Sequence, residues 1–243
     1  LRDSAQTMKL SPMMCEYLKT KEEYKDCILF YRLGDFYEMF FDDALVASKE
    51  LEITLTGKSC GLEERAPMCG IPYHAVEGYL SKLVSRGYKV AICEQVEDPK
   101  LAKGLVKREV IRVVTPGTNL NVQSLEAGKN NYLLSIAYTP DGIGISAADV
   151  TTGDYYVTEV EDLKKLNDEL MKYEPSEIIC NEAFLVSGFD VNVLKSRLHI
   201  SVNALESHMF DDDGCRRILM KHFKVNTLIG LGVEEFPTGL LAA

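Results

Sequence analysis

The middle of the chain contains a polar stretch, residues 119–130 (NLNVQSLEAGKN), which has no strong hydrophobic periodicity. It has neither the spacing of an amphipathic helix nor the alternation of a half-buried strand, so it predicts a linker. A chain of 243 residues is long enough for two ordinary domains around such a linker. We therefore expect a first domain at 1–118, a linker at 119–128 and a second domain at 129–243.

The two halves of the chain differ in charge. Residues 1–120 hold 17 Lys and Arg against 18 Asp and Glu, a net of −1. The whole chain has 27 against 37, so residues 121–243 hold 10 against 19, a net of −9. The mean field of the second half repels a phosphate backbone, and the first half can bind nucleic acid only through a local basic face.

The composition is that of a globular protein, with 46% hydrophobic and 26% charged residues. The seven cysteines form no C-x-x-C pair and mostly lie inside apolar runs, which favours buried thiols in a reducing cytoplasm. No apolar run reaches the roughly 18 residues that a membrane span needs, and no signal peptide opens the chain. Because the chain begins at Leu1 and not at Met, we expect it to be a fragment of a longer protein.

The first domain alternates helical and strand patterns, which predicts an α/β fold with a mixed sheet. Ser11 and Pro12 suit the N-cap and first turn of a helix that runs to about residue 25. Further helices are expected at 42–51 and 74–86, whereas Gly and Pro predict a loop over 57–72. Apolar and β-branched runs predict strands at 27–33, 36–40, 53–56, 88–94 and 110–114.

The second domain opens with three strand patterns joined by short turns that contain Gly, at 132–138, 143–149 and 154–160. These strands predict an antiparallel meander. A helix near 161–173 and a strand at 177–180 follow, and another helix is expected around 213–223. Three strands followed by alternating helix and strand is the ribonuclease H-like order.

The segment RLGDFYEMF at residues 32–40 holds the most informative pattern in the chain. Strand geometry places Phe36 and Glu38 on one face of a strand that follows a tight turn, with Tyr37 on the other face. A carboxylate beside an aromatic ring is unusual for a core, because Glu rarely faces inward unless it is paired. The pattern alone still favours a half-buried edge strand in which Phe36 packs and Glu38 is solvated.

Four blocks of sequence resemble the N-terminal blocks of the MutS family, in order and at fitting distances. They are GDFYEMF at 34–40, APMCGIPYHA at 66–75, VAICEQ at 90–95 and RVVTPGT at 112–118. The resemblance covers nearly all of residues 8–120. It is weaker from residue 130 onward, where DVTTG at 149–153 is the best anchor for the family's connector domain.

The resemblance implies that the first domain recognises mismatched DNA and that the second is a ribonuclease H-like connector. On this interpretation Phe36 enters the minor groove and stacks on a mispaired base. Glu38 hydrogen-bonds to that base, as a protonated acid or as an acceptor. A mismatch lowers the cost of unstacking and kinking the duplex, because its pairing is already weak. We therefore expect discrimination with little sequence preference.

Other positions of the first domain carry over from the resemblance less directly. Leu33 and Met68 align with positions near Phe36 that touch the groove or the backbone. Phosphate contacts are implied for Lys58, Arg108 and Tyr73. A core methionine at 68 and ordinary solvated charges at 58 and 108 are the alternatives. His74 begins a predicted helix, where a capping role is the simpler interpretation.

The resemblance also bears on cofactors and partners. No G-x-x-x-x-G-K-[ST] loop occurs in the sequence, and in the family that loop lies downstream. We therefore expect no cofactor, metal or catalysis in this fragment, and ATP and Mg²⁺ in an absent C-terminal region. The parent protein would be an ATPase and a homodimer, and the fragment a monomer. Besides mismatched double-stranded DNA, the connector would bind a downstream MutL-like repair protein.

Two other classes of function compete with this interpretation. Ribonuclease H-like nucleases hold two metal ions with clustered carboxylates, and Asp149 near a strand end resembles the start of such a site. The later strand offers only Glu182 beyond its end, and residues 211–213 suit a helix N-cap and first turn, so a nuclease is disfavoured. A purely structural or protein-binding pair of domains would bind matched and mismatched duplexes equally.

Overall fold

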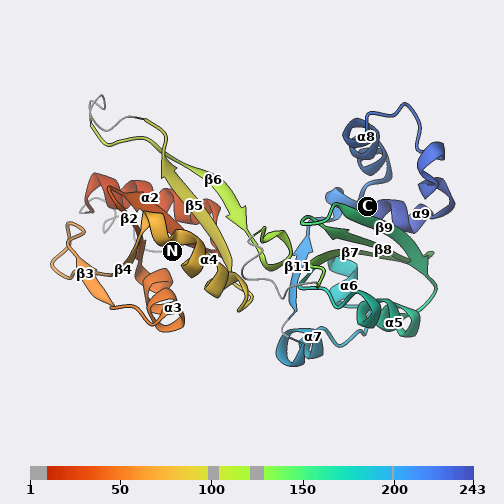
Figure 1. The fold of residues 1–243 in the computed structure, drawn as a ribbon, viewed down its shortest axis with the longest axis horizontal. Coiled ribbons are helices and arrows are strands. Elements are labelled where there is room, and N and C mark those ends of the chain that lie inside the picture. The colour runs from red at the N-terminus through yellow and green to blue at the C-terminus, as the bar shows by residue number, and fades with distance from the viewer. Residues whose placement is uncertain (1–9, 98–103, 121–128, 199) are drawn as a thin grey trace. The chain divides into compact units, whose positions relative to one another are not determined.

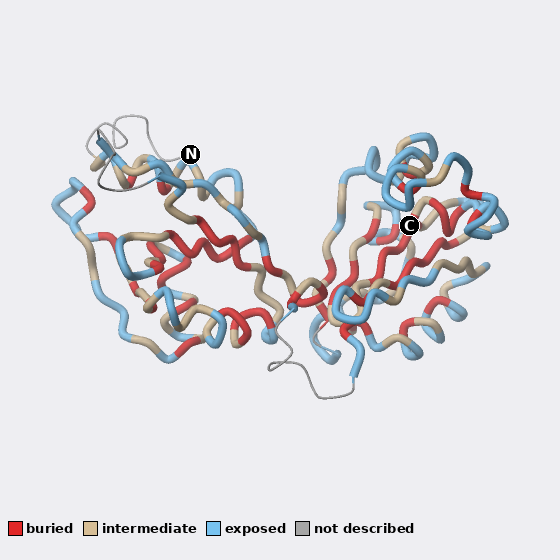
Figure 2. Tube along the Cα trace, turned by 45° about the horizontal axis from the view of Figure 1, so that its top comes forward, coloured by how far each residue is buried: buried red, intermediate tan, exposed pale blue. Residues whose placement is uncertain are grey.

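The structure is a computed structural model, and it describes residues 10–97, 104–120, 129–198 and 200–243. The chain separates into two compact units between Thr115 and Pro116 (Figure 1). This division falls three residues before the expected end of the first domain at 118, and residues 121–128 of the expected linker lie outside the described residues. Figure 2 shows that the buried residues of each unit follow the strands of its sheet.

Six strands make up the described sheet of the first unit, namely β1 (Cys27–Leu33), β2 (Phe36–Phe40), β3 (Thr56–Lys58), β4 (Ala66–Pro72), β5 (Lys89–Gln95) and β6 (Arg108–Val114). Their order in the sheet is β3-β4-β2-β1-β5-β6. β1 and β5 are parallel, and the other neighbours are antiparallel. The prediction of a mixed sheet is confirmed.

Helices cover both faces of this sheet. α2 (Pro12–Glu23) packs on one face, where its buried Tyr17 lies against Tyr31 of β1 with ring centroids 5.4 Å apart. α3 (Phe41–Leu51) and α4 (Val76–Val84) pack on the other face and bury a separate core. Alternate residues of β1, β2, β4 and β5 therefore enter different cores, as the period of two requires.

The segment after α3 differs from the prediction. The strand expected at 53–56 lies at 56–58, and the loop expected over 57–72 contains β4. Gly and Pro favour turns, but Pro67 and Pro72 lie near the two ends of β4, where prolines are tolerated. Pairing of β4 with β2 along the whole of β2 overrides the local preference.

Two predictions at helix starts have different outcomes. The start of α2 is confirmed, because Ser11 Oγ accepts a hydrogen bond from Met14 N and Pro12 lies in the first turn. The helix expected over 74–86 is a 3₁₀ turn, η1 (Tyr73–Ala75), followed by α4, and no side chain caps either of them. The capping role expected for His74 is therefore wrong.

Five strands form the described sheet of the second unit, namely β7 (Tyr132–Thr139), β8 (Gly142–Asp149), β9 (Asp154–Val160), β10 (Glu177–Asn181) and β11 (Ser201–Leu205). Their order is β11-β10-β7-β8-β9. β7, β8 and β9 form the antiparallel meander, and β10 and β11 add in parallel on the other side of β7. This is the ribonuclease H-like order, so the predicted fold is confirmed.

Helices of the second unit build two cores. The larger core lies between the sheet and α5 (Leu163–Tyr173), α6 (Glu182–Leu185) and α7 (Val191–Arg197). A smaller core joins α8 (Asp212–Phe223) and α9 (Pro237–Ala242). Short 3₁₀ turns lie at Pro116–Thr118, Ser207–Phe210, Ile229–Leu231 and Val233–Glu235.

The acidic run at 211–213 has the role expected of it. Asp211 is the N-cap of α8 and accepts a hydrogen bond from Gly214 N at 3.0 Å, and the next two aspartates lie in the first turn. Carboxylates at this end of a helix are favoured by its dipole.

α9 approaches the second sheet closely at Gly144 of β8. A Cβ atom on Gly144 would lie 1.8 Å from the carbonyl oxygen of Thr238, so no larger residue fits there. Thr238 is also held by Glu159 of β9, whose carboxylate accepts hydrogen bonds from its backbone N at 3.1 Å and from its Oγ1 at 2.7 Å. These contacts fix α9 onto β8 and β9.

Six of the seven cysteines are buried, as their apolar surroundings predicted. Burial raises the pKa of the Cys69 and Cys93 thiols to about 12, which keeps them protonated and unreactive. In the described parts of the chain, no helix is long and apolar enough to cross a membrane.

Candidate nucleic-acid interface

A tight hairpin joins β1 to β2 and presents Phe36. Leu33 pairs with Phe36 across the hairpin, and Tyr31 pairs with Glu38. Gly34 has φ +59°, whereas Asp35 is not among the residues with positive φ, which is the pattern of a type II′ turn. Such a turn matches the twist of the two strands, so Phe36 is the first residue of a strand and not part of a loose loop.

The two sides of β2 have different environments. Tyr37 and Met39 point into the core beneath α3 and α4. Phe36 and Glu38 lie on the opposite face, where Phe36 is 47% exposed and the Glu38 side chain is 15% exposed. The alternation expected from the sequence is confirmed, and it places an exposed aromatic ring beside a carboxylate.

Gly70 of β4 lies between these two side chains. It pairs directly with Glu38, and a Cβ atom on it would lie 3.6 Å from Glu38 Cγ and 3.9 Å from Phe36 Cδ1. Because Gly70 has no side chain, Phe36 and Glu38 are neighbours with no third side chain at this position.

Glu38 is paired with Lys58, a residue that the sequence suggested as a phosphate contact. Glu38 Oε2 and Lys58 Nζ are 2.5 Å apart, and the Lys58 side chain is 33% exposed. Lys58 Nζ also lies 5.8 Å from the centroid of the Phe40 ring. The structure therefore brings Lys58 to the same face as Phe36 and Glu38, and it bonds the cation to the carboxylate.

Leu33 and Met68 lie on this face as well. Leu33 pairs with Phe36, and Met68 pairs with Phe40. Both side chains are partly buried against the core beneath α2. Each therefore combines packing with partial exposure next to the Phe36 hairpin, so the core alternative for Met68 and the contact predicted from the resemblance are compatible.

Arg108, at the start of β6, reaches back toward β1. Its Nε donates to the carbonyl oxygen of Arg32 at 2.8 Å, and one terminal nitrogen donates to that of Val106 at 2.7 Å. Its guanidinium carbon lies 5.2 Å from the centroid of the Tyr31 ring. Arg108 is thus held in a fixed position beside the strand that leads to the hairpin.

Tyr73 is not grouped with Phe36 and Glu38. Tyr73 is 42% exposed, and its ring centroid lies 3.8 Å from the guanidinium carbon of Arg32. The Arg32 side chain lies on the face that carries Tyr37. The backbone N of Tyr73 donates to the carbonyl oxygen of Asp35 at 3.0 Å. Tyr73 therefore lies behind the turn of the hairpin, where it contacts the turn directly.

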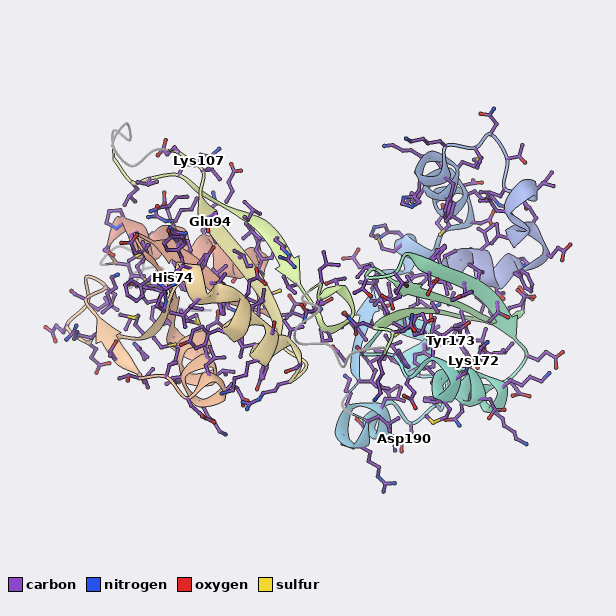
Figure 3. The ribbon with its side chains drawn as sticks, viewed as in Figure 1. His74, Glu94, Lys107, Lys172, Tyr173 and Asp190 are labelled. Atoms are coloured by element: carbon purple, nitrogen blue, oxygen red, sulfur yellow. The ribbon has the colours of Figure 1, made fainter. Side chains whose placement is uncertain are left out.

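Arg32 and Glu94 complete this group behind the hairpin, and the sequence did not single them out. Arg32 donates to Glu94 at 3.3 Å, and the Tyr37 hydroxyl donates to the same carboxylate (Glu94 and His74 are labelled in Figure 3). Burial and the Glu94 carboxylate raise the pKa of Tyr37 to about 12. The available signal was the alternation itself, because Arg32 and Tyr37 are paired in the hairpin.

Comparison with known proteins supplies the family. The family model described as MutS domain I matches residues 11–123, and that described as MutS domain II matches residues 131–243. The chain belongs to the MutS family. The resemblance noted in the four sequence blocks is thereby confirmed, and it extends over the second unit.

The chain is similar to bacterial proteins named DNA mismatch repair protein MutS. The chain is 65% identical over 235 residues to the one from Lachnoclostridium phytofermentans, which covers 97% of this chain and 25% of that protein. It is 54% identical over 237 residues to the one from Ruminiclostridium cellulolyticum, covering 96% and 27%. The chain thus spans about a quarter of the length of these MutS relatives.

In the part of the chain that matches MutS domain II, Asp149 is a buried carboxylate with full hydrogen bonding. One oxygen accepts from Asn131 N at 2.9 Å and Asn130 Nδ2 at 2.9 Å, and the other accepts from Thr151 N at 2.8 Å and Thr151 Oγ1 at 2.6 Å. Burial alone would raise its pKa, but the hydrogen bonds from Thr151 and Asn131 outweigh burial and lower it. In this MutS chain Asp149 therefore fixes the start of β7 to the end of β8.

A nuclease site would need several carboxylates around the same metal ions. Over the described ranges, no group of three or more His, Cys, Asp or Glu side chains is placed to hold a metal ion. The hydrogen bonds to Asp149 give that residue a structural role in the MutS fold instead.

Glu177 holds the 3₁₀ turn at Pro116–Thr118 against the sheet of the second unit. Its Oε2 accepts from Gly117 N at 3.0 Å, and its Oε1 accepts from Asn203 Nδ2 at 3.1 Å. A Cβ atom on Gly117 would lie 2.9 Å from Leu133 Cβ, so this turn packs tightly on the sheet. Gly117 is therefore anchored to the second unit of the MutS chain.

Proposed function

We propose that this chain recognises mispaired or unpaired bases in duplex DNA at the start of mismatch repair. Phe36 enters the minor groove and stacks on the mispaired base, and Glu38 hydrogen-bonds to that base. The observation that carries the proposal is the exposed Phe36 ring beside Glu38 at the end of a hairpin that Arg32 and Tyr73 hold from behind. The names of the relatives point to the same substrate.

Deformability of the DNA supplies the discrimination in this proposal. Inserting an apolar ring between base steps unstacks and kinks the duplex, at a cost of a few kcal/mol for each step. A mismatch reduces that cost because its bases are already weakly paired, whereas a matched step resists. Glu38 adds a hydrogen bond that only a displaced base offers. Phe36 and Glu38 together therefore respond to weak base pairing in the duplex and not to a particular sequence.

The other residues around the hairpin make the remaining contacts with the groove and the phosphate backbone. Leu33 and Met68 contact the edges of the groove next to Phe36. Arg108 and Tyr73 contact the phosphate backbone, which positions the protein without reading sequence. The second unit, with most of the negative charge of the chain, stays off the phosphates.

The remaining proposals concern a protein as long as the MutS relatives, about a quarter of whose length this chain spans. We propose that it is a cytoplasmic homodimer with ATPase activity, that ATP and Mg²⁺ bind outside these residues, and that these residues themselves catalyse no reaction. The second unit acts as a connector that transmits the DNA-bound state and binds a MutL-like repair protein.

The test is anisotropy binding of the full-length protein to duplexes with and without a single G·T mismatch, at fixed salt. We expect the wild type to prefer the mismatch, Phe36→Ala to abolish the preference while keeping most of the nonspecific binding, and Glu38→Ala to reduce it. Tyr156→Ala is the matched control, because Tyr156 of the second unit is an aromatic residue with the same 47% exposure.

Two outcomes would contradict the proposal. Equal binding of both duplexes by the wild type would favour a scaffold made of two protein-binding domains. A preference that survives Phe36→Ala would place the base-reading group elsewhere.

A further inference from the structure

Glu38 presents an electrostatic problem if its face meets DNA. A carboxylate that approaches a phosphate backbone is repelled, and this repulsion is strongest where water is excluded. Glu38 is mostly shielded from solvent, with a side chain only 15% exposed. On a matched duplex, where no displaced base offers it a hydrogen bond, the charge would oppose binding.

The structure places one cation directly on this carboxylate. Lys58 Nζ lies 2.5 Å from Glu38 Oε2, although the two residues belong to strands separated by β4. The β4 residues that pair with them are Ala66, opposite Lys58, and Gly70, opposite Glu38. Because both are small, the residues paired directly with Lys58 and Glu38 place no large side chain opposite either residue.

We propose that Lys58 is a positioning residue that neutralises Glu38 until a mispaired base replaces it. This inference rests on the proposed function and assigns Lys58 to Glu38 instead of to a phosphate. On a matched duplex the pair stays closed and adds no net charge to the contact. On a mismatched duplex the displaced base hydrogen-bonds to the Glu38 carboxylate, and the Lys58 ammonium group is released from the ion pair.

The two roles of Lys58 predict different changes in DNA binding. A phosphate contact would be lost equally on matched and mismatched duplexes, and the slope of log K against log salt would fall by about 0.9. If Lys58 is instead the partner of Glu38, its removal would weaken binding mainly to the matched duplex, where the Glu38 carboxylate has no other partner. The effect of removing Lys58 would also depend on the presence of a charge at position 38.

The experiment is a double-mutant cycle in the full-length protein, with Lys58→Met, Glu38→Gln and the double variant on matched and G·T duplexes at several salt concentrations. We expect Lys58→Met to weaken binding to the matched duplex about fivefold and binding to the mismatched duplex less than about twofold. The mismatch-to-matched affinity ratio therefore rises. In the Glu38→Gln background the same substitution should change matched binding less than about twofold.

Control variants separate a folding defect from the expected effect. Lys58→Arg retains a cation that can pair with Glu38 and should behave as the wild type. Lys49→Met removes an exposed lysine from α3, which covers the other face of the sheet, and should leave both affinities unchanged.

The outcomes distinguish this inference from the proposed function. A wild type without mismatch preference would overturn both. A wild type with the preference, combined with equal losses from Lys58→Met on both duplexes or an undiminished loss in the Glu38→Gln background, would overturn this inference alone.

Discussion

The guanidinium carbon of Arg32 lies 3.8 Å from the centroid of the Tyr73 ring, directly behind the turn that precedes Phe36. The same side chain donates to the carbonyl oxygen of Gly34 at 2.5 Å and to Glu94 at 3.3 Å. One side chain thus ties the hairpin turn to β5 and to η1. One planar guanidinium makes all three contacts at once, and the point charge of a lysine does not have the width to do so.

Replacing Arg32 by Lys is therefore expected to loosen the hairpin. We expect the mismatch-to-matched affinity ratio to fall about fivefold, with a loss of about 1–2 kcal/mol in the free energy of unfolding. Anisotropy binding and urea unfolding measure the two effects. Arg86→Lys is the control, because Arg86 is also bonded to a glutamate, Glu50, but lies away from the hairpin. An unchanged ratio in Arg32→Lys would show that this support is dispensable.

Gly70 allows a graded test of the space between Phe36 and Glu38. A Cβ atom there would make ordinary contacts, at 3.9 Å from Phe36 Cδ1 and 3.6 Å from Glu38 Cγ, so Gly70→Ala should bind mismatched DNA as the wild type does. Gly70→Val adds methyl groups that crowd both side chains, and we expect about tenfold weaker mismatch binding. Matched binding by the same variants is the reference. Equal behaviour of the Ala and Val variants would argue against close contact at this position.

Gly144 should be far less tolerant. Gly144→Ala places a Cβ atom 1.8 Å from Thr238 O and must displace α9, so we expect a loss of about 3 kcal/mol in the stability of the second unit. Gly78→Ala in α4 is the matched control, because its Cβ would meet nothing within 4 Å. That variant should gain about 0.5–1 kcal/mol from its better helix propensity. Urea unfolding compares the two, and a wild-type midpoint for Gly144→Ala would contradict the close approach.

Asp149 should make stability depend on pH. Its pKa is lower in the folded chain than the roughly 3.9 of an unfolded chain, so its contribution is complete above that value and is lost as the pH falls through the folded pKa. Asp149→Asn should therefore cost about 2 kcal/mol at pH 7 and less near pH 3. Urea midpoints at both pH values test this. Asp168→Asn, at an exposed position of α5, is the control, and a pH-independent loss at Asp149 would refute the linkage.

Local patterns in the sequence were enough for much of the fold. The hairpin followed from a Gly turn between two apolar runs, and the ribonuclease H-like order followed from three strands and a helix. β4 was missed because its prolines and glycine favour a turn, and only pairing with β2 makes the segment a strand.

In the candidate site, too, local sequence predicts some features, whereas others depend on contacts between residues far apart in the chain. The placement of Phe36 and Glu38 on one face follows from the period of a strand, which is a local property. The pairing of Glu38 with Lys58, and that of Arg32 with Glu94, joins residues 20 and 62 positions apart. Such contacts depend on the order of strands in the sheet, which no local pattern contains.

The position of Phe36 in a paired strand has a consequence for the thermodynamics of recognition. Phe36 pairs with Leu33 on one side and with Pro72 on the other, so its backbone loses its conformational freedom when the protein folds. Little ordering of the protein is then left for the moment of binding. For the function proposed above, we therefore expect the hairpin to change little on binding and the DNA to supply most of the deformation.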